Sequence, residues 1–320
     1  MPNFLGAKHW VGFKPQTVPG TAETTVTTFL STENINMNAK PTHIPRKTHI
    51  GTGRSLPLRL GYTKPEGKCV SEVMASQPQP WYWLLGHVVT TQPAISTDPT
   101  VYLHTITATE PVNLTVEGDK VYQKAKQADA KVNKITLSGQ VGEVANLALE
   151  WFGLKHTEPA TLTSTPVYVT DVLTVRSATI KIAGTPDVTI ENFEISYDTG
   201  LEQLPTIEDV AGAPHSVRVK DPSKAAGKFK FIDFPVAELA RLVAAAQFAL
   251  IVELDGPIIS TTYKKFLRVT LPACQYTGGF DNDIAESVIT GEGSFEGFYD
   301  TVTGNQILVE AQNSVVTINT

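Results

Sequence analysis

The sequence predicts a mainly β protein in which one unit, a small β-sandwich or half-barrel with a single flanking helix, occurs twice in tandem. Three observations predict this fold: the composition, the alternation of apolar residues in many short segments, and a shared order of elements in the two halves of the 320-residue chain. Thr accounts for 40 residues, Pro for 21 and Gly for 23. Threonine favours strands, whereas proline and glycine separate them. At roughly 100–200 residues per domain, two domains fit the length, and we place them at residues 1–160 and 161–320.

The first half begins with residues 1–20, which lack periodicity and carry several Gly and Pro, so we expect an irregular N-terminal arm. A Thr-rich strand should follow at residues 24–30. A helix is expected at residues 76–86, where proline stands near the start, glycine at the end, and large apolar side chains share one face. Residues 122–130 are a further helix candidate. Alternation predicts more strands around Leu56, Leu58 and Leu60; Val112, Leu114 and Val116; Ile135 and Leu137; and Leu147, Leu149 and Trp151.

The second half shows the same style of alternation. The apolar phase shifts by one residue between Ile190 and Phe193, which predicts a β-bulge because side chains alternate faces with a period of two. A helix is expected at residues 235–246, where apolar residues fall at i, i+3, i+4 and i+7. Strands are predicted around Thr179–Ile182, Val217 and Val219, Phe229 and Phe231, and Leu267, Val269 and Leu271.

Short matches align the two halves. Glu33-Asn34-Ile35 matches Glu191-Asn192-Phe193, and Gly67-Lys68 matches Gly227-Lys228, with offsets of 158 and 160 residues. Later matches are Thr136-Leu137 with Thr270-Leu271, at an offset of 134, and Trp151-Phe152-Gly153 with Phe295-Glu296-Gly297. The smaller offset implies an insertion of about 26 residues after the first helix, which we place at residues 92–100 and in part of 117–132. The alternative is two unrelated β-rich domains of similar size.

Charge and motifs exclude several function classes. The formal net charge is -6, with +3 in residues 1–160 and -9 in residues 161–320, which is the wrong sign for a protein that grips nucleic acid. No apolar run approaches the roughly 20 residues of a membrane span, and we expect no secretory signal. Two cysteines allow no disulfide framework or zinc spacing. We therefore expect no enzyme, catalytic residue, metal site or cofactor.

Several of these segments together resemble a phage tail tube protein (major tail protein) of the long, non-contractile tails, of the double-length type with two tube domains per chain. The carriers are residues 11–28 (VGFKPQTVPGTAETTVTT), the strand–long loop–strand units at 33–60 and 191–219, the helix in each half, and residues 134–153 (KITLSGQVGEVANLALEWFG) with 268–297. The insertion after the first helix departs from the plain pattern.

The resemblance implies a structural subunit of the virion tail that is assembled in the host cytoplasm. Six tube domains would form a ring by continuing one another's sheets, so three chains would make a pseudo-hexameric ring. Rings would stack into a tube around a lumen through which DNA passes without specific binding, and the acidic half would suit such a wall. The implied partners are other copies of the chain, a tape-measure protein, and tail-tip and terminator proteins.

In the resembled family, a long loop between the first paired strands reaches the next ring. This loop maps here to residues 39–55 and 198–214, so the resemblance gives as ring-stacking candidates Ile44, Arg46, His49, Arg54, Leu204, Ile207 and Val210. The alternative for these residues is an ordinary flexible loop.

Two functions of other classes remain open at this stage. One is a two-domain β-sandwich binding module, such as a glycan-binding or virion decoration protein, which predicts exposed aromatic side chains, with Trp81 and Trp83 as candidates. The other is a β-rich hydrolase that uses a pair of carboxylates, although no such pair stands at a recognisable spacing.

Overall fold

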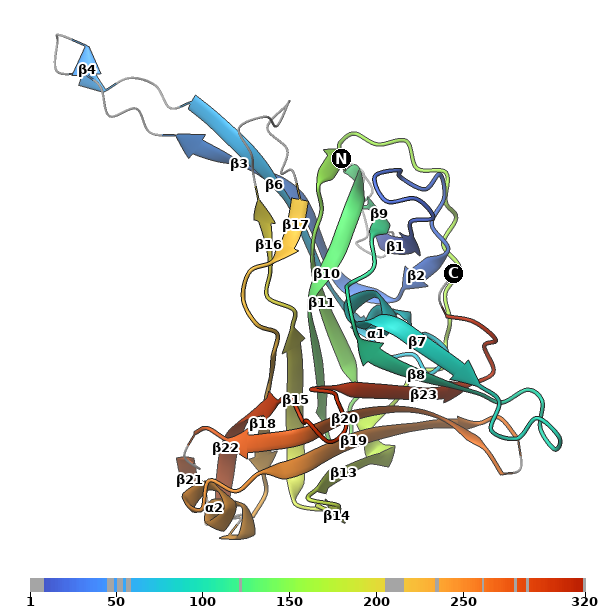
Figure 1. Cartoon of the computed structure of the whole chain (residues 1–320), viewed down its shortest axis with the longest axis vertical. Helices are drawn as coiled ribbons and strands as arrows, with labels where there is room; N and C mark the ends of the chain where they lie inside the picture. Colours follow the sequence, from blue (N-terminus) through green and yellow to red (C-terminus); the bar gives the residue numbers. More distant parts are fainter. Residues whose placement is uncertain are drawn as a thin grey trace.

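In the computed structural model, antiparallel strands form most of the chain, and the described residues also include two α-helices and a short 3-10 helix (Figure 1). The structure describes residues 9–44, 49–50, 54–55, 59–120, 123–204, 216–233, 236–260, 262–278, 281–285 and 288–318. The prediction of a mainly β protein with one helix in each half is confirmed.

The first half contains twelve strands and helix α1. In chain order they are β1 (Trp10–Pro15), β2 (Thr28–Leu30), β3 (Thr32–Ile44), β4 (His49–Ile50), β5 (Arg54–Ser55), β6 (Arg59–Glu72), α1 (Gln79–Leu85), β7 (Gly86–Thr91), β8 (Tyr102–Ala108), β9 (Leu114–Asp119), β10 (Lys124–Gln140), β11 (Asn146–Phe152) and β12 (Lys155–Thr157).

A linker, residues 158–174, leads to the second half. Its elements are a 3-10 turn (Val175–Ser177), β13 (Ala178–Ile182), β14 (Thr185–Pro186), β15 (Ile190–Asp198), β16 (Leu201–Leu204), β17 (Ser216–Val219), β18 (Lys224–Phe231), α2 (Val236–Val243), β19 (Phe248–Ile258), β20 (Lys264–Tyr276), β21 (Asp281–Ala285), β22 (Val288–Phe298) and β23 (Leu308–Asn313).

The strands of the two halves pair in the same order. In the first half β2–β1–β9–β10–β11–β6–β3 are successive antiparallel neighbours. In the second half the sequence of neighbours is β14–β13–β19–β20–β22–β18–β15. The register of β15 on β18 shifts between Ile190 and Asn192, so the predicted bulge is confirmed.

One feature of the close packing recurs in both halves. A Cβ atom added to Gly67 on β6 would lie 2.1 Å from the ring of Trp151 on β11. A Cβ atom added to Gly227 on β18 would lie 2.4 Å from the ring of Phe295 on β22. In each half, therefore, glycine lets an aromatic ring from the neighbouring strand lie flat against the backbone.

A single large cluster of buried apolar residues runs through both halves. It follows from the alternation of the strands: on β11, for example, Leu147, Leu149 and Trp151 are buried while the residues between them are more exposed. The two inner faces of the sheets supply the cluster, and α1 completes it. The described chain contains no helix long and apolar enough to cross a membrane.

Three expectations are corrected. Residues 10–15 of the expected arm form the buried strand β1, in which Val11 and Phe13 are fully buried and Gly12 makes room for Val26 and Phe29. The expected helix at residues 122–130 is wrong, because from Lys124 the chain forms β10, whose pairing with β9 overrides the helix preference of Ala, Lys and Gln.

The third correction concerns the alignment after the first helix. Thr270 pairs with β19 and β23, whereas Thr136 pairs with β11 and β15, so the two are not equivalent. The element without a counterpart in the second half is the β7–β8 hairpin, which includes residues 92–100; residues 117–132 belong to the β9–β10 hairpin, whose counterpart is β19–β20.

Candidate assembly interface

The two halves join through a continuous sheet. Strand β10 of the first half pairs with β15 of the second from Lys134↔Asp198 to Gln140↔Asn192. Leu137 and Ile195 pair at its centre, and both are fully buried. We call this pairing the β10–β15 junction.

Buried polar side chains fix the chain where it leaves this junction. Asn133, only 9% exposed, accepts hydrogen bonds at its Oδ1 from the backbone N–H of Leu201 (3.0 Å) and from the Thr199 hydroxyl (3.3 Å). Gln203, 5% exposed, donates from Nε2 to the carbonyl oxygens of Pro65 (2.6 Å) and Gly153 (2.8 Å). The Asn133 bonds attach the start of β16 to β10, and the Gln203 bonds attach β16 to β6 and to the residue after β11, because a buried amide is costly without partners. Sequence reasoning missed both residues, since a lone Asn or Gln in an alternating segment carries no signal of burial.

A second contact between the halves joins β8 to β23, from Tyr102↔Asn313 to Thr107↔Leu308. His104 lies buried in this contact, between the Thr90 hydroxyl (2.9 Å from Nδ1) and Asn313 Oδ1 (3.1 Å from Nε2). Burial lowers the pKa of His104, so the ring is neutral and can donate at one nitrogen and accept at the other. The C-terminal strand is thereby fixed to the hairpin that follows α1.

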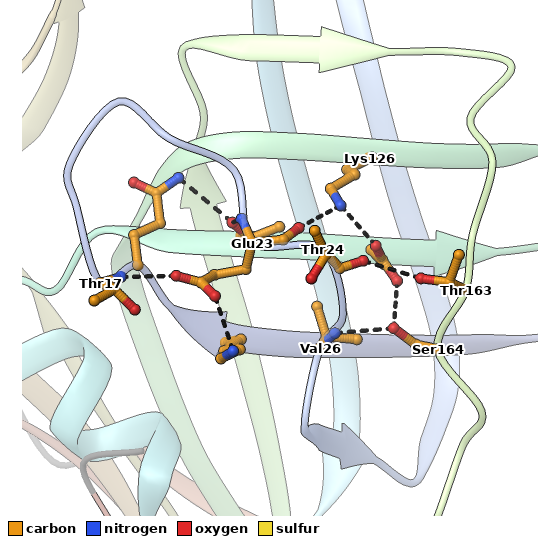
Figure 2. A network of polar contacts seen from close by, with 11 residues as sticks. Thr17, Glu23, Thr24, Val26, Lys126, Thr163 and Ser164 are labelled. Carbon is orange, nitrogen blue, oxygen red and sulfur yellow. Dashed lines mark hydrogen bonds and ion pairs between the residues drawn. The ribbon is translucent and has the colours of Figure 1, made fainter.

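The linker is held against the first half by a buried charge (Figure 2). Glu117 is fully buried and accepts hydrogen bonds from Lys126 Nζ (2.9 Å) and from the Ser164 hydroxyl (2.7 Å). Ser164 Oγ also accepts the backbone N–H of Val26 (2.9 Å), and the Thr163 hydroxyl donates to the Thr24 carbonyl (3.0 Å). The linker and residues 17–30 therefore share one polar network, which fixes the path of the chain between the halves.

Several described strands of the continuous sheet have one partner strand only, among them β2, β7, β12 and β14, and two further edges of this kind, β3 and β21, correspond to the strands of the β10–β15 junction. Within the part of the chain that the structure describes, β3 pairs along its length with β6 alone, and β21 pairs with β22 alone. The corresponding strands lie inside the sheet. Strand β15 corresponds to β3, and it pairs with a segment of β10. That segment of β10 precedes β11 in the chain as β21 precedes β22, so it corresponds to β21. The two open edges are therefore the same kind of edge that the β10–β15 junction joins within the chain.

The predicted stacking loops are mostly β ribbons. Strands β3 and β6 extend away from the body with β4 at the far end, as Figure 1 shows. Ile44 ends β3, whereas His49 and Arg54 lie in β4 and β5, which pair with each other in a separate two-stranded sheet. Leu204 ends β16 opposite Ser216 and is half-buried. Arg46, Ile207 and Val210 lie outside the described residues.

The outward face of the second-half sheet carries paired charges. Lys228 on β18 lies 3.5 Å from Glu194 on β15, and Lys230 lies 2.8 Å from Glu191. Lys224 pairs with Glu296 on β22. This face therefore presents cross-strand ion pairs rather than a uniformly acidic surface.

The exposed aromatics expected of a binding module are not found at the candidate positions. Trp81 is 1% exposed and Trp83 0%, because α1 turns both rings into the core, where Trp83 packs against Phe13 with ring centroids 4.7 Å apart. Among the described residues, no three His, Cys, Asp or Glu side chains lie close enough to hold a metal ion.

Comparison with known protein families assigns the chain to a family. A model of the family described as phage tail tube protein matches residues 6–230, which is well over half of the chain and runs from the N-terminal strands to the end of β18. No curated protein matches the sequence. The chain therefore belongs to the phage tail tube protein family and is a structural subunit of a phage tail tube.

Proposed function

We propose that three copies of this chain form a pseudo-hexameric ring and that such rings stack into a tube through which DNA passes. The observation that carries the proposal is the β10–β15 junction, which joins the two halves by the same pair of edges that the chain leaves open at β21 and β3. If β21 of one copy receives β3 of the next, every junction in the ring has one geometry. We further propose that the halves arose by duplication, which explains the shared pairing order.

The contact between copies is heterologous, since β21 and β3 are different surfaces. A heterologous contact closes into a ring when its rotation divides a full turn, and otherwise it forms an open filament. Because two units lie in each chain, a ring of six units needs three chains. Ring closure would also protect both edges from uncontrolled pairing.

We infer that the face with paired charges lines the lumen. The lysines of β18 each lie beside a glutamate of a neighbouring strand, so a DNA phosphate would have to compete with a carboxylate for each of them. Few counterions would be released on contact, and DNA would pass without being held.

We assign the ring-to-ring contact to the β3–β6 ribbon and to the β16–β17 pair, with Ile44, Arg46, His49, Arg54, Leu204, Ile207 and Val210 as candidates. The length of the ribbon and its projection from the body support this assignment. Tape-measure, tail-tip and terminator proteins would act at the lumen and at the two ends of the tube, after assembly in the host cytoplasm.

Cross-linking and electron microscopy of the assembled protein test the ring. Asn36→Cys on β3 and Asp283→Cys on β21, treated with a short bis-maleimide, should give covalent dimers and trimers and no larger closed species within a ring. Burial raises the pKa of both native thiols, Cys69 and Cys274, to about 12, so they should not react.

The matched control pairs Asn36→Cys with Val188→Cys, which is 87% exposed but lies on the loop before β15, away from both open edges. This variant should give no specific cross-link. End-on images should show three-fold symmetry. Protein that stays monomeric at high concentration, or rings without three-fold symmetry, would refute the proposal.

A further inference from the structure

The first half carries a docking position that the second half fills. Where the pairing of β11 with β6 ends, the carbonyl oxygens of Pro65 and Gly153 both accept hydrogen bonds from Gln203 Nε2, at 2.6 and 2.8 Å. Gln203 belongs to β16, the continuation of β15 beyond the β10–β15 junction. One unit thus reaches across the junction and bonds two carbonyl groups of the unit before it, of which the Pro65 carbonyl also accepts the N–H of Gly153 at 3.0 Å.

The corresponding position in the second half is filled from within. Gly153 stands two residues after Trp151, and Gly297 stands two residues after Phe295. These two aromatic residues correspond, because each ring packs against a glycine of the neighbouring strand, Gly67 or Gly227. The Gly297 carbonyl accepts a hydrogen bond from Gln306 Nε2 at 2.9 Å. The same amide nitrogen lies 3.4 Å from the carbonyl of Ser223, the residue before β18, and its oxygen accepts the Ser223 hydroxyl at 2.9 Å. The residue that corresponds to Pro65 is Ala225, which pairs with Gly297, so the shared part of the two contacts is the bond to the glycine carbonyl.

Gln306 lies on a segment that the first half lacks. Only residues 153–154 separate β11 from β12, whereas residues 299–307 separate β22 from β23. Apart from Gln306, the side-chain hydrogen bonds of this loop stay within it: Asp300 accepts from the N–H groups of Val302 and Thr303, and Asn305 donates to the Thr303 carbonyl. Ile307 at the end of the loop is fully buried in the core, but Val302 is 90% exposed and Tyr299 65%, so little apolar surface holds residues 299–306 down.

We propose that residues 299–306 are a cap that covers, in the free subunit, the position where the base of the β3–β6 ribbon of a second copy docks, and that assembly displaces Gln306. This inference rests on the proposed ring. In that ring β3 of the next copy would pair with β21 as β15 pairs with β10, and the β3–β6 ribbon would then continue from β3 to the capped position as β16 continues from β15. The register of β3 on β6 shifts between Pro41 and His43, near the place that corresponds to the turn from β15 into β16. The cap and the intrachain contact share one bond, from a glutamine amide to the carbonyl of the glycine that follows β11 or ends the pairing of β22 with β18, so the cap competes for that carbonyl.

The concentration at which tubes appear tests the cap. Gln306→Ala removes the amide and leaves the loop in place, whereas Asn305→Ala, the matched control, removes an amide that bonds only within the loop. A cap held by a few ordinary hydrogen bonds should raise the protein concentration at which tubes appear by about tenfold. Gln306→Ala should therefore form tubes at about one tenth of the wild-type concentration. Asn305→Ala should assemble like the wild type.

A label on the loop of the otherwise unchanged protein gives a second readout that does not depend on the stability of Gln306→Ala. A nitroxide on Val302→Cys should report a change in loop mobility when subunits join, and none in a subunit kept below the assembly concentration. Two results would overturn the proposal of a cap. One is a wild-type protein that forms tubes while Gln306→Ala assembles no better, and the other is a label whose spectrum is unchanged in tubes. Absence of tubes from the wild-type protein would instead overturn the proposed function.

Discussion

The two helices occupy matching places in the chain order and are held in different ways. Four large residues of α1 are fully buried or nearly so: Trp81, Trp83, Leu84 and Leu85. The β7–β8 hairpin follows α1 directly and lies beside it (Figure 1). On α2, by contrast, Val236 is 68% exposed and Val243 81%.

A buried polar contact anchors α2, together with the half-buried Leu239 and Leu242, which pack against the core cluster. The Tyr276 hydroxyl of β20 donates to Glu238 Oε2 at 2.8 Å, and Arg241 Nε lies 3.2 Å from Glu238 Oε1. The comparison teaches that the first helix completes the core, whereas the second is attached to its surface. The stability of the chain should therefore depend on the first helix far more than on the second.

The largest effect should come from removing an aromatic ring of α1. Trp83→Ala empties a closed site in the core and should lower the free energy of unfolding by about 3–5 kcal/mol. Val243→Ala on α2 should change it by less than about 0.5 kcal/mol, because that side chain is exposed. Chemical denaturation of both variants checks the difference, and similar losses from the two would contradict the contrast between the helices.

A smaller effect is expected at the anchor of α2. Tyr276→Phe leaves the buried Glu238 without one of its donors and should cost about 1–3 kcal/mol. Burial beside Glu238 also raises the pKa of Tyr276, so the hydroxyl stays a donor over the working pH range. Tyr299→Phe, at a tyrosine that is 65% exposed, is the control and should leave the melting temperature unchanged. An equal effect of the two substitutions would show that the anchor contributes nothing.

The smallest effect concerns how the stability of the first half depends on pH. Hydrogen bonds from Lys14 and Thr17 lower the pKa of Glu23 from 4.5 to about 2, so the unfolded chain binds this proton more readily than the folded one. The stabilisation is complete above about pH 4.5 and is lost as the pH falls towards 2. Melting temperatures measured across this range should fall less steeply for Glu23→Gln than for the wild type. Glu33→Gln, at an exposed carboxylate, should keep the wild-type slope.

Local signals predicted the helices and the bulge, because caps and periodicity lie within a few residues of one another. Gly86 ends α1 in the left-handed conformation, as its place after Leu85 led us to expect. The helix predicted at residues 122–130 was wrong because the Ala, Lys and Gln residues there favour a helix. Only pairing with distant strands makes Lys124–Gln140 the strand β10.

The interface was harder to predict than the fold. The long loops were found from the sequence, but their organisation into ribbons depends on pairings such as His43↔Leu60 that no local pattern encodes. Gln203 and Gln306 have no special sequence context, and their role follows only from the carbonyl groups that the fold brings to them.

The covalent continuity of the β10–β15 junction has a kinetic consequence. This junction forms during folding, at an effective concentration set by residues 158–174 and not by the amount of protein present. In a ring of three chains, only three of the six junctions would then require an encounter between separate molecules, and only those three would lose translational and rotational freedom. In the proposed ring, joining two units in one chain would thus halve the number of collisions that each new layer of the tube requires.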